Sequence, residues 1–362
     1  MTRDHNRSDG SHPRGISRRE FIKLAAMAGL LAGCRPTRQV VVTAPPTSMP
    51  TDAPTPAPTT TPTTAPTAAP SAELSKVVRA RHASVWDGDS LVPEAVRQML
   101  DASITKLTGL DDAREAWATL FAPDEHIAIK VNTIRTSNFW THVPLVMAVT
   151  ECLQDAGVPA EQIVIFDRRT RELEYAGFPV NEDGPGVRCY GTEGGYTAGW
   201  TIMDTSVRLS DVLLNCDALI NVPILKHHNH SGITFAMKNH FGTFDRPSSF
   251  HRPRTGPAIT ELNGLLPIRN RTRLVIGDTL AVCPLSRGGW HQAVTGDSIL
   301  VSFDPVAHDT VGLQMLGEVM ASEGIDPAPA IDLANGWLTS SAELGLGTND
   351  LDNIELVEIN LG

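Results

Sequence analysis

Lysine and histidine side chains are concentrated between positions 226 and 251 of the 362-residue chain. Five of the ten histidines that follow residue 33 lie in this stretch, among them His228, His230 and His251, and it also holds Lys226 and Lys238. Neutral imidazoles are good ligands for zinc, nickel, copper or iron. A partly buried lysine amine can lose its proton near neutral pH and act as a base. The stretch therefore predicts a site for metal or cofactor binding, or for proton transfer.

The spacing of these residues suggests how they share one site. His228 and His230 are two residues apart, so an extended segment would point both rings to the same side. A helix that starts at Thr234 would place Lys238 one turn further along the same face. The predicted roles are catalytic for Lys226, Lys238 and His228, cofactor-binding for Asn239, Thr234 and Asp278, and metal-binding for His228, His230 and His251.

Simpler explanations stay open for the same residues. A histidine cluster on a loop often serves hydrogen bonding alone, and a lysine after an apolar stretch usually extends to solvent. The stretch has neither the H-E-x-x-H nor the C-x-x-C spacing of common zinc sites. A transition metal (nickel, zinc or iron) is thus one candidate cofactor among several. An iron–sulfur cluster is not expected, because the five cysteines include no C-x-x-C pair.

The elements that must position these side chains alternate between strand and helix. Apolar runs predict strands at 77–85, 126–132, 162–167, 217–222, 273–278, 298–303 and 354–359, and helices at 143–156, 305–316 and 327–335. This alternation is typical of an α/β fold with a mostly parallel sheet and helices on both faces. Ligands of such sheets bind at the carboxyl ends of the strands. The strand-end residues to consider are Asn132, Asp167, Asn221, Asp278 and Asp304.

The first 33 residues resemble a twin-arginine export signal with a lipobox. Arg18 and Arg19 precede an apolar run that is too short to span a bilayer, and the run ends at Cys34. This order predicts export by the twin-arginine translocase, lipidation of Cys34, and a lipid anchor on the outer face of the cytoplasmic membrane. The alternative is a buried amphipathic helix with an incidental arginine pair.

A linker is expected at 34–72, before a folded α/β domain at 73–362. Residues 44–72 contain nine Pro, nine Thr and seven Ala, a composition that cannot form a packed core and favours an extended, disordered chain. The net charge of the chain is −11, and it becomes −14 without residues 1–33. This acidic balance argues against nucleic acid as a partner. A small-molecule ligand is expected instead.

The motifs around the lysines and histidines resemble the bacterial and archaeal family called domain of unknown function 362. The resemblance is carried by Asn221-Val222-Pro223, Leu225-Lys226-x-His228, Met237-Lys238-Asn239, Ile276-Gly277-Asp278 and Ser302-Phe303-Asp304-Pro305. A weaker likeness, at the level of the fold, is to the nickel-pincer lactate racemases. That likeness implies a covalent cofactor link at Lys238, and metal ligation or proton transfer at His228 or His251.

Two functions follow from these patterns. The first is a membrane-anchored, extracytoplasmic enzyme that depends on a metal or cofactor, an oxidoreductase or isomerase, and acts on a small anionic metabolite. Arg168, Arg169 and Arg171 follow the strand at 162–167 and could clamp such an anion, although a solvated charged loop explains them equally well. The second function is a lipoprotein that binds a ligand or metal without turnover.

Overall fold

The computed structural model describes residues 74–362, except 135–138, 252, 288–289 and 292. The expected export signal, linker and lipidation site, with Arg18, Arg19 and Cys34, lie outside the described residues. Within the described part, no helix has both the length and the apolar character that crossing a membrane requires.

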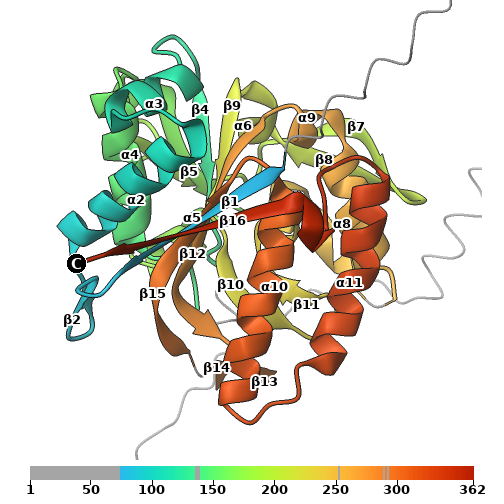
Figure 1. Cartoon of the computed structure of the whole chain (residues 1–362). Helices are drawn as coiled ribbons and strands as arrows, with labels where there is room; N and C mark the ends of the chain where they lie inside the picture. The colour runs from blue at the N-terminus through green and yellow to red at the C-terminus, as the bar shows by residue number, and fades with distance from the viewer. Residues whose placement is uncertain (1–73, 135–138, 252, 288–289, 292) are drawn as a thin grey trace, which may run out of the picture. The chain divides into compact units, whose positions relative to one another are not determined.

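A ten-stranded mixed sheet organises the described part of the chain (Figure 1). The strands along its main path are, in spatial order, β16 (Ile354–Leu361), β1 (Ser75–His82), β15 (Val294–Ser302), β12 (Thr272–Cys283), β9 (Ala218–Asn221), β4 (Ile127–Lys130), β5 (Ile163–Asp167) and β6 (Arg188–Gly191). Two further strands, β10 (Ile224–His228) and β11 (Gly232–Thr234), branch from β12. The first and last strands, β1 and β16, pair in parallel.

The sheet is mostly parallel, as the sequence predicts. Strands β12, β9, β4, β5 and β6 run in one direction, whereas β15 is antiparallel to both of its neighbours, β1 and β12. The chain passes from β4 to β5 and β6 on one side and then returns to β9 on the other side of β4. The strand order thus reverses between β4 and β9, and the carboxyl ends of strands at such a point are the usual place for a ligand.

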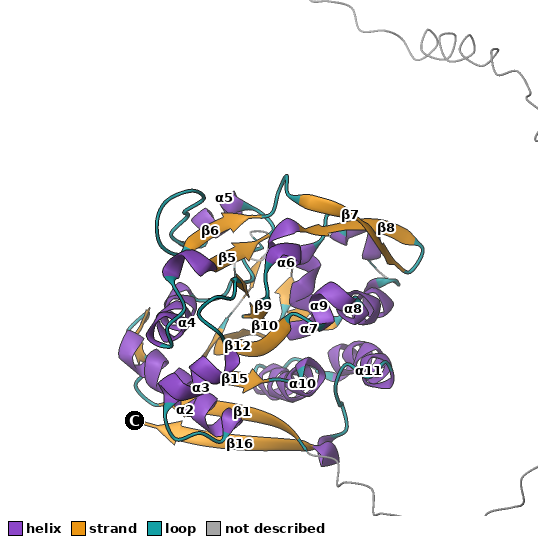
Figure 2. Ribbon diagram, turned by 90° about the horizontal axis from the view of Figure 1, so that it is seen from above, coloured by secondary structure: helices purple, strands orange, loops and turns teal. Residues whose placement is uncertain are grey.

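Helices cover both faces of the sheet (Figure 2). One apolar cluster joins the sheet to α2 (Pro93–Thr108), α3 (Ala113–Leu120) and α4 (Val143–Asp155). A second cluster joins the other face to α6 (Asp211–Asn215), α8 (Thr255–Gly264), α9 (Leu266–Arg269), α10 (Pro305–Ser322) and α11 (Ala328–Glu343). Successive residues of a strand pack into different clusters because their side chains point to opposite faces of the sheet. Ile127 belongs to the first cluster and Ala128 to the second.

Each strand and helix expected from the apolar runs is present, with shifted ends. The expected helix at 305–316 continues to Ser322, and the one expected at 327–335 continues to Glu343. Helix α10 begins where the Asp304 carboxylate accepts hydrogen bonds from the backbone N–H groups of Val306 and Ala307. Asp304 therefore caps a helix, which is a structural role.

Candidate functional site

Three parallel strands end in buried polar residues at the point where the strand order reverses. Strand β4 ends in Lys130, β9 ends in Asn221, and β5 ends in Asp167, and all three residues are buried. Burying a polar or charged group is unfavourable unless a partner satisfies it. The contacts that satisfy these three residues define the candidate site.

Lys130 and Asp167 form a fully buried ion pair. The Lys130 Nζ atom lies 2.7 Å from Asp167 Oδ1, and the two side chains are 1% and 5% exposed. The backbone N–H and the hydroxyl of Thr133 donate to Asp167 Oδ2, at 2.6 and 2.8 Å. Burial would raise the pKa of Asp167, but the charge of Lys130 and these hydrogen bonds lower it overall. Burial also lowers the pKa of Lys130, against the opposing effect of Asp167.

Asn239 connects this ion pair to β9. Its Oδ1 accepts hydrogen bonds from Asn132 Nδ2 at 3.0 Å and from Lys130 Nζ at 3.4 Å. Its Nδ2 donates to Asn221 Oδ1 at 2.7 Å and to the Lys130 carbonyl at 3.3 Å. The amide is thus held at both ends by groups of this chain, so Asn239 orders the site. Its predicted contact with a cofactor stays a prediction.

Lys226 enters the same network from β10. Its Nζ donates to Asn132 Oδ1 at 2.8 Å and to the Phe139 carbonyl at 3.1 Å, and its side chain is almost completely buried. Burial lowers the pKa of Lys226 to about 8, and the nearby charge of Lys130 adds to this effect while Asp167 opposes it. Lys226 therefore remains mainly protonated at neutral pH.

Lys238 lies in α7 (Ala236–Asn239) and is partly exposed. Its Nζ stands 3.6 Å from the centre of the Phe241 ring, a cation–π contact. Burial lowers the pKa of Lys238 to about 7, and the charges of Lys226 and Lys130 lower it further. The amine of Lys238 is therefore partly neutral near pH 7, as a general base at that pH requires.

The helix that carries Lys238 is much shorter than the sequence analysis expects. Thr234 belongs to strand β11, opposite Lys226 in the β10–β11 pair, and the helix spans only Ala236–Asn239. The Asp309 carboxylate of α10 accepts hydrogen bonds from the backbone N–H groups of Ala236 and Met237, at 2.7 and 2.9 Å. The expectation of a helix from Thr234 was wrong, because strand pairing extends to that residue.

The three predicted metal ligands lie in a row at the end of the β10–β11 pair. The His230 ring centre is 5.6 Å from that of His228 and 5.0 Å from that of His251. The His228 Nδ1 atom accepts a hydrogen bond from the His230 backbone N–H at 3.2 Å and lies 3.1 Å from the Ser231 hydroxyl. Burial lowers the pKa of His228 to about 2, with Lys238 as the next cause. His228 is therefore a neutral imidazole whose proton is on Nε2.

The described residues do not fit a metal centre. Within them, no group of three or more His, Cys, Asp and Glu side chains is arranged to hold a metal ion. A metal ligated by His228, His230 and His251 thus stays a prediction from sequence.

Asp278, a predicted cofactor ligand, is fully buried and bonded to its own chain. Its Oδ2 accepts from the backbone N–H and from Nδ1 of His142, each at 2.8 Å, and its Oδ1 accepts from the Leu280 N–H. Burial lowers the pKa of His142, but the charge of Asp278 and this hydrogen bond raise it overall. These contacts show Asp278 fixing His142 at the start of α4.

Sequence reasoning missed Lys130, which forms the ion pair of the site. Lys130 is the last residue of the strand Ile127–Lys130, whose other residues are apolar. The pattern therefore predicts a buried strand there and does not single out Lys130 as a site residue. A lysine in a fully buried strand, beside a neighbouring strand that ends in aspartate, is the signal that could have identified it. His240 was also missed. Burial lowers its pKa to about 3, and its Nε2 lies 3.3 Å from the Asn221 amide.

A known protein family matches the segment of the chain that carries the candidate site. Residues 127–314 match the protein family described as Domain of unknown function (DUF362), and this segment contains the site residues from Lys130 to Asp309. No curated protein matches the chain.

Two solved structures show distant likeness in fold. One is the lactate racemase apoprotein from Thermoanaerobacterium thermosaccharolyticum, with 8% identity, a TM-score of 0.41, and coverage of 66% of this chain and 56% of the other. The second is a protein from Thermotoga maritima, with 11% identity, a TM-score of 0.32, and coverage of 71% of this chain and 60% of the other. The chain thus spans less than two thirds of either structure, and at these scores neither likeness bears on activity.

Proposed function

Because the chain belongs to the DUF362 family, as its motifs predict, and the family description assigns no activity, we propose a function from the site itself. The protein binds a small anionic metabolite at the carboxyl ends of β4 and β9, and the Lys238 amine takes a proton from that metabolite. The observation that carries this proposal is that three lysines lie close enough for their charges to lower the pKa of Lys226 and Lys238.

The chain has six lysines in total, and three of them, Lys130, Lys226 and Lys238, contribute to this site. Lys130 lowers the pKa of both Lys226 and Lys238, and Lys226 also lowers that of Lys238, so the three charges are close enough to repel. The Asp167 carboxylate lies 2.7 Å from Lys130 Nζ and offsets part of this repulsion. An incoming anion would relieve the remaining repulsion.

The two lysines whose pKa values lie near neutral pH suit different tasks. Lys226, with a pKa of about 8, keeps its charge at neutral pH and favours the bound anion. Lys238, with a pKa of about 7, is partly neutral and can accept a proton. In the proposed step, a C–H bond next to the anionic group breaks, an N–H bond forms on Lys238, and the proton is then returned to carbon. The net reaction is an isomerisation that needs no oxidant.

Calorimetric titration of the full chain with acetate, malonate and phosphate tests the binding half of the proposal. In a titration at pH 6, where Lys238 is mainly protonated, we expect at least one of these anions to bind, and Lys238→Met to weaken that binding by about tenfold or more, the effect of losing one charged partner. The exposed Lys106 provides the matched control, and Lys106→Met is expected to bind as the wild type does. Failure of all three anions to bind, or equal binding by Lys238→Met, contradicts the proposal.

Solvent exchange tests the catalytic half. Small carboxylic acids are incubated with the protein in deuterated water, and deuterium at the carbon next to the carboxylate is followed by NMR. We expect incorporation by the wild type and none by Lys238→Met. Binding without exchange would instead identify a ligand-binding protein. Intact mass of the protein purified from its own host would show whether Lys238 carries a covalently bound cofactor.

A further inference from the structure

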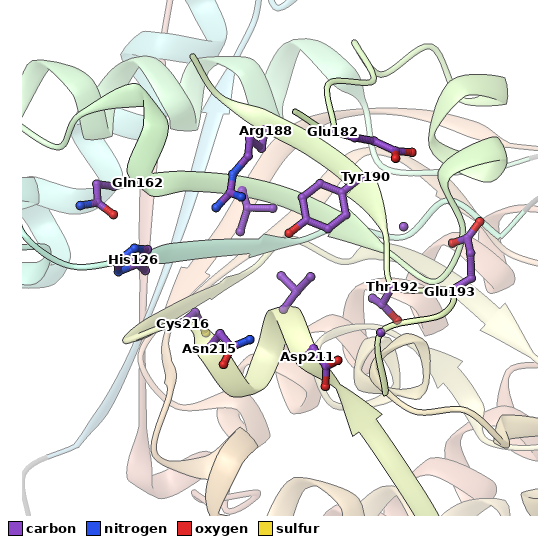
Figure 3. A pocket seen from close by; sticks show the side chains of 14 residues that line it. His126, Gln162, Glu182, Arg188, Tyr190, Thr192, Glu193, Asp211, Asn215 and Cys216 are labelled. Carbon is purple, nitrogen blue, oxygen red and sulfur yellow. The ribbon is translucent and has the colours of Figure 1, made fainter. Parts of the chain in front are cut away.

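A second polar pocket lies along the edge strand β6, and none of the lysines discussed above lines it. The pocket has a volume of about 400 Å³. It is bounded by β6, by α6, and by the turn that follows β6 at residues 192–195. Figure 3 shows Arg188 and Tyr190 directed into it from β6, with Glu182, Glu193 and Asp211 around its other side.

The guanidinium of Arg188 in this pocket has no anionic partner among the residues that the structure describes. Arg188 forms no ion pair with the described residues, and its buried Nε has no hydrogen-bond acceptor there. Its guanidinium carbon is 6.0 Å from the centre of the Tyr190 ring. A guanidinium held in this way presents N–H groups that match a carboxylate, often through two parallel hydrogen bonds.

The negative charges of the pocket also have no cationic partner in the described part of the chain. The Glu193 carboxylate accepts hydrogen bonds from the Thr170 backbone N–H, and Asp211 Oδ1 accepts one from the Thr197 hydroxyl. Each carboxylate retains capacity for further donors, since an ionised carboxylate has about four acceptor positions. In Figure 3, Arg188 and Glu193 lie on opposite sides of the Tyr190 ring.

We propose that this pocket binds a small molecule with a carboxylate at one end and an ammonium group at the other. The carboxylate pairs with Arg188, the ammonium group is held by the acidic side chains, and the chain between them packs along Tyr190. Unpaired charges of both signs in one pocket are best matched by a ligand with the complementary pair. The site is separate from the lysine site and does not depend on the function proposed for it.

Calorimetry with 6-aminohexanoate on the full chain tests this proposal, with hexanoate and hexylamine as probes of the separate ends. We expect 6-aminohexanoate to bind at least about tenfold more tightly than either single-charge probe, because both ends gain a charged partner. Arg188→Gln is expected to remove most of this advantage. The double variant Glu182→Gln/Glu193→Gln is also expected to remove most of this advantage, because it removes two of the carboxylates that hold the ammonium end of the ligand. This variant keeps the test usable if Arg188→Gln does not fold.

Two control variants separate this site from others. Arg171 is exposed and does not line the pocket, so Arg171→Gln should bind 6-aminohexanoate as the wild type does. Arg188→Gln should weaken 6-aminohexanoate binding to the same extent in the wild type and in a Lys238→Met background, which separates this pocket from the lysine site, where a carboxylate is also proposed to bind. The proposal is overturned if 6-aminohexanoate does not bind, if hexanoate or hexylamine binds equally well, or if folded Arg188→Gln binds it with unchanged affinity.

Discussion

At the scale of single residues, the site is defined by three lysine charges and by the different groups that each lysine contacts. Lys130 has a carboxylate at 2.7 Å, whereas Lys226 donates to an amide oxygen and a carbonyl, and Lys238 lies against an aromatic ring. The three lysines therefore differ in what stabilises their protons. In the proposed function, this difference gives Lys130 a structural role and makes Lys238 the base.

Asp167→Asn tests the structural role of the buried ion pair. The substitution leaves the Lys130 ammonium buried without its counter-charge, so we expect a loss of about 3–5 kcal/mol in the free energy of unfolding, measured with urea. The double variant Lys130→Met/Asp167→Leu removes both charges and should recover most of this loss. If Asp167→Asn lowers the free energy of unfolding by less than about 1 kcal/mol, which is typical of an exposed ion pair, the result would contradict the structural role of the buried pair.

Lys238→Met tests the pKa of the proposed base through the pH dependence of stability. The pKa of Lys238 is lowered from 10.5 to about 7. Below pH 7 the Lys238 amine is therefore charged in both the folded and the unfolded chain, and the folded chain bears the full free-energy cost of burying that charge. Between these values the unfolded chain binds the extra proton, so wild-type stability should rise with pH relative to the variant. We expect Lys238→Met to be the more stable by on the order of 1–2 kcal/mol at low pH, after allowance for partial exposure. This difference should vanish above the ordinary lysine pKa, and a difference independent of pH would contradict the shift.

The sequence predicts Lys226, Lys238 and Asn239 as site residues because a dense polar run follows a strand end. In the structure Lys226 and Asn239 both hydrogen-bond to Asn132, whereas Lys238 is coupled to this group only through the charges of Lys226 and Lys130, and the roles of all three stay predictions. The sequence does not predict the ion pair between Lys130 and Asp167, because the two residues are far apart in sequence and meet only through the pairing of β4 with β5. The contacts of Asp278 with His142 likewise depend on tertiary packing.

At the scale of elements, the turn after α7 closes the site over the ion pair. Gly242 lies in the 3₁₀ turn His240–Thr243. A Cβ atom on Gly242 would lie 2.5 Å from Asp167 Oδ1 and 2.6 Å from Lys130 Nζ. The absence of a side chain at position 242 therefore allows this turn to pack directly on the buried charges.

Gly242→Ala is expected to destabilise the protein by about 1–3 kcal/mol, the usual cost of forcing extra volume into a packed region. Gly336→Ala is the matched control, because a Cβ there meets nothing within 4 Å and the residue lies inside helix α11. The control should be neutral or stabilising by about 0.5–1 kcal/mol, since alanine favours helix. Equal effects of the two substitutions, measured by urea unfolding, would show that the turn does not rest on the ion pair.

The types of the elements could be predicted from sequence more reliably than their extents. Buried strands such as Ile163–Asp167 form continuous apolar runs, which periodicity detects. The short hairpin of β10 and β11 was not expected, because its pairing of Lys226 with Thr234 depends on neighbours in space. Tertiary pairing of this kind overrides local helix preference.

At the scale of the whole molecule, the strand order explains why the lysines meet. The alternation of strands and helices predicts a mostly parallel α/β sheet, but it does not predict the order in which strands pair or the antiparallel β15. That order reverses between β4 and β9, and the reversal brings Lys130 and Asn221 to adjacent strand ends. A cationic site on a chain of net charge −11 is then a local feature created by topology.

Acylation of Lys238 in the full chain, followed by peptide mass spectrometry across a pH series with and without malonate, tests the central claim most directly. The exposed Lys106 serves as the internal reference for the reagent. The account predicts a half-maximal rate near pH 7 for Lys238, because only the neutral amine reacts. It also predicts that malonate protects Lys238 and moves this midpoint to higher pH, since a bound anion favours the ammonium form. A midpoint near the ordinary lysine pKa of 10.5, or equal labelling with and without malonate, would contradict the account.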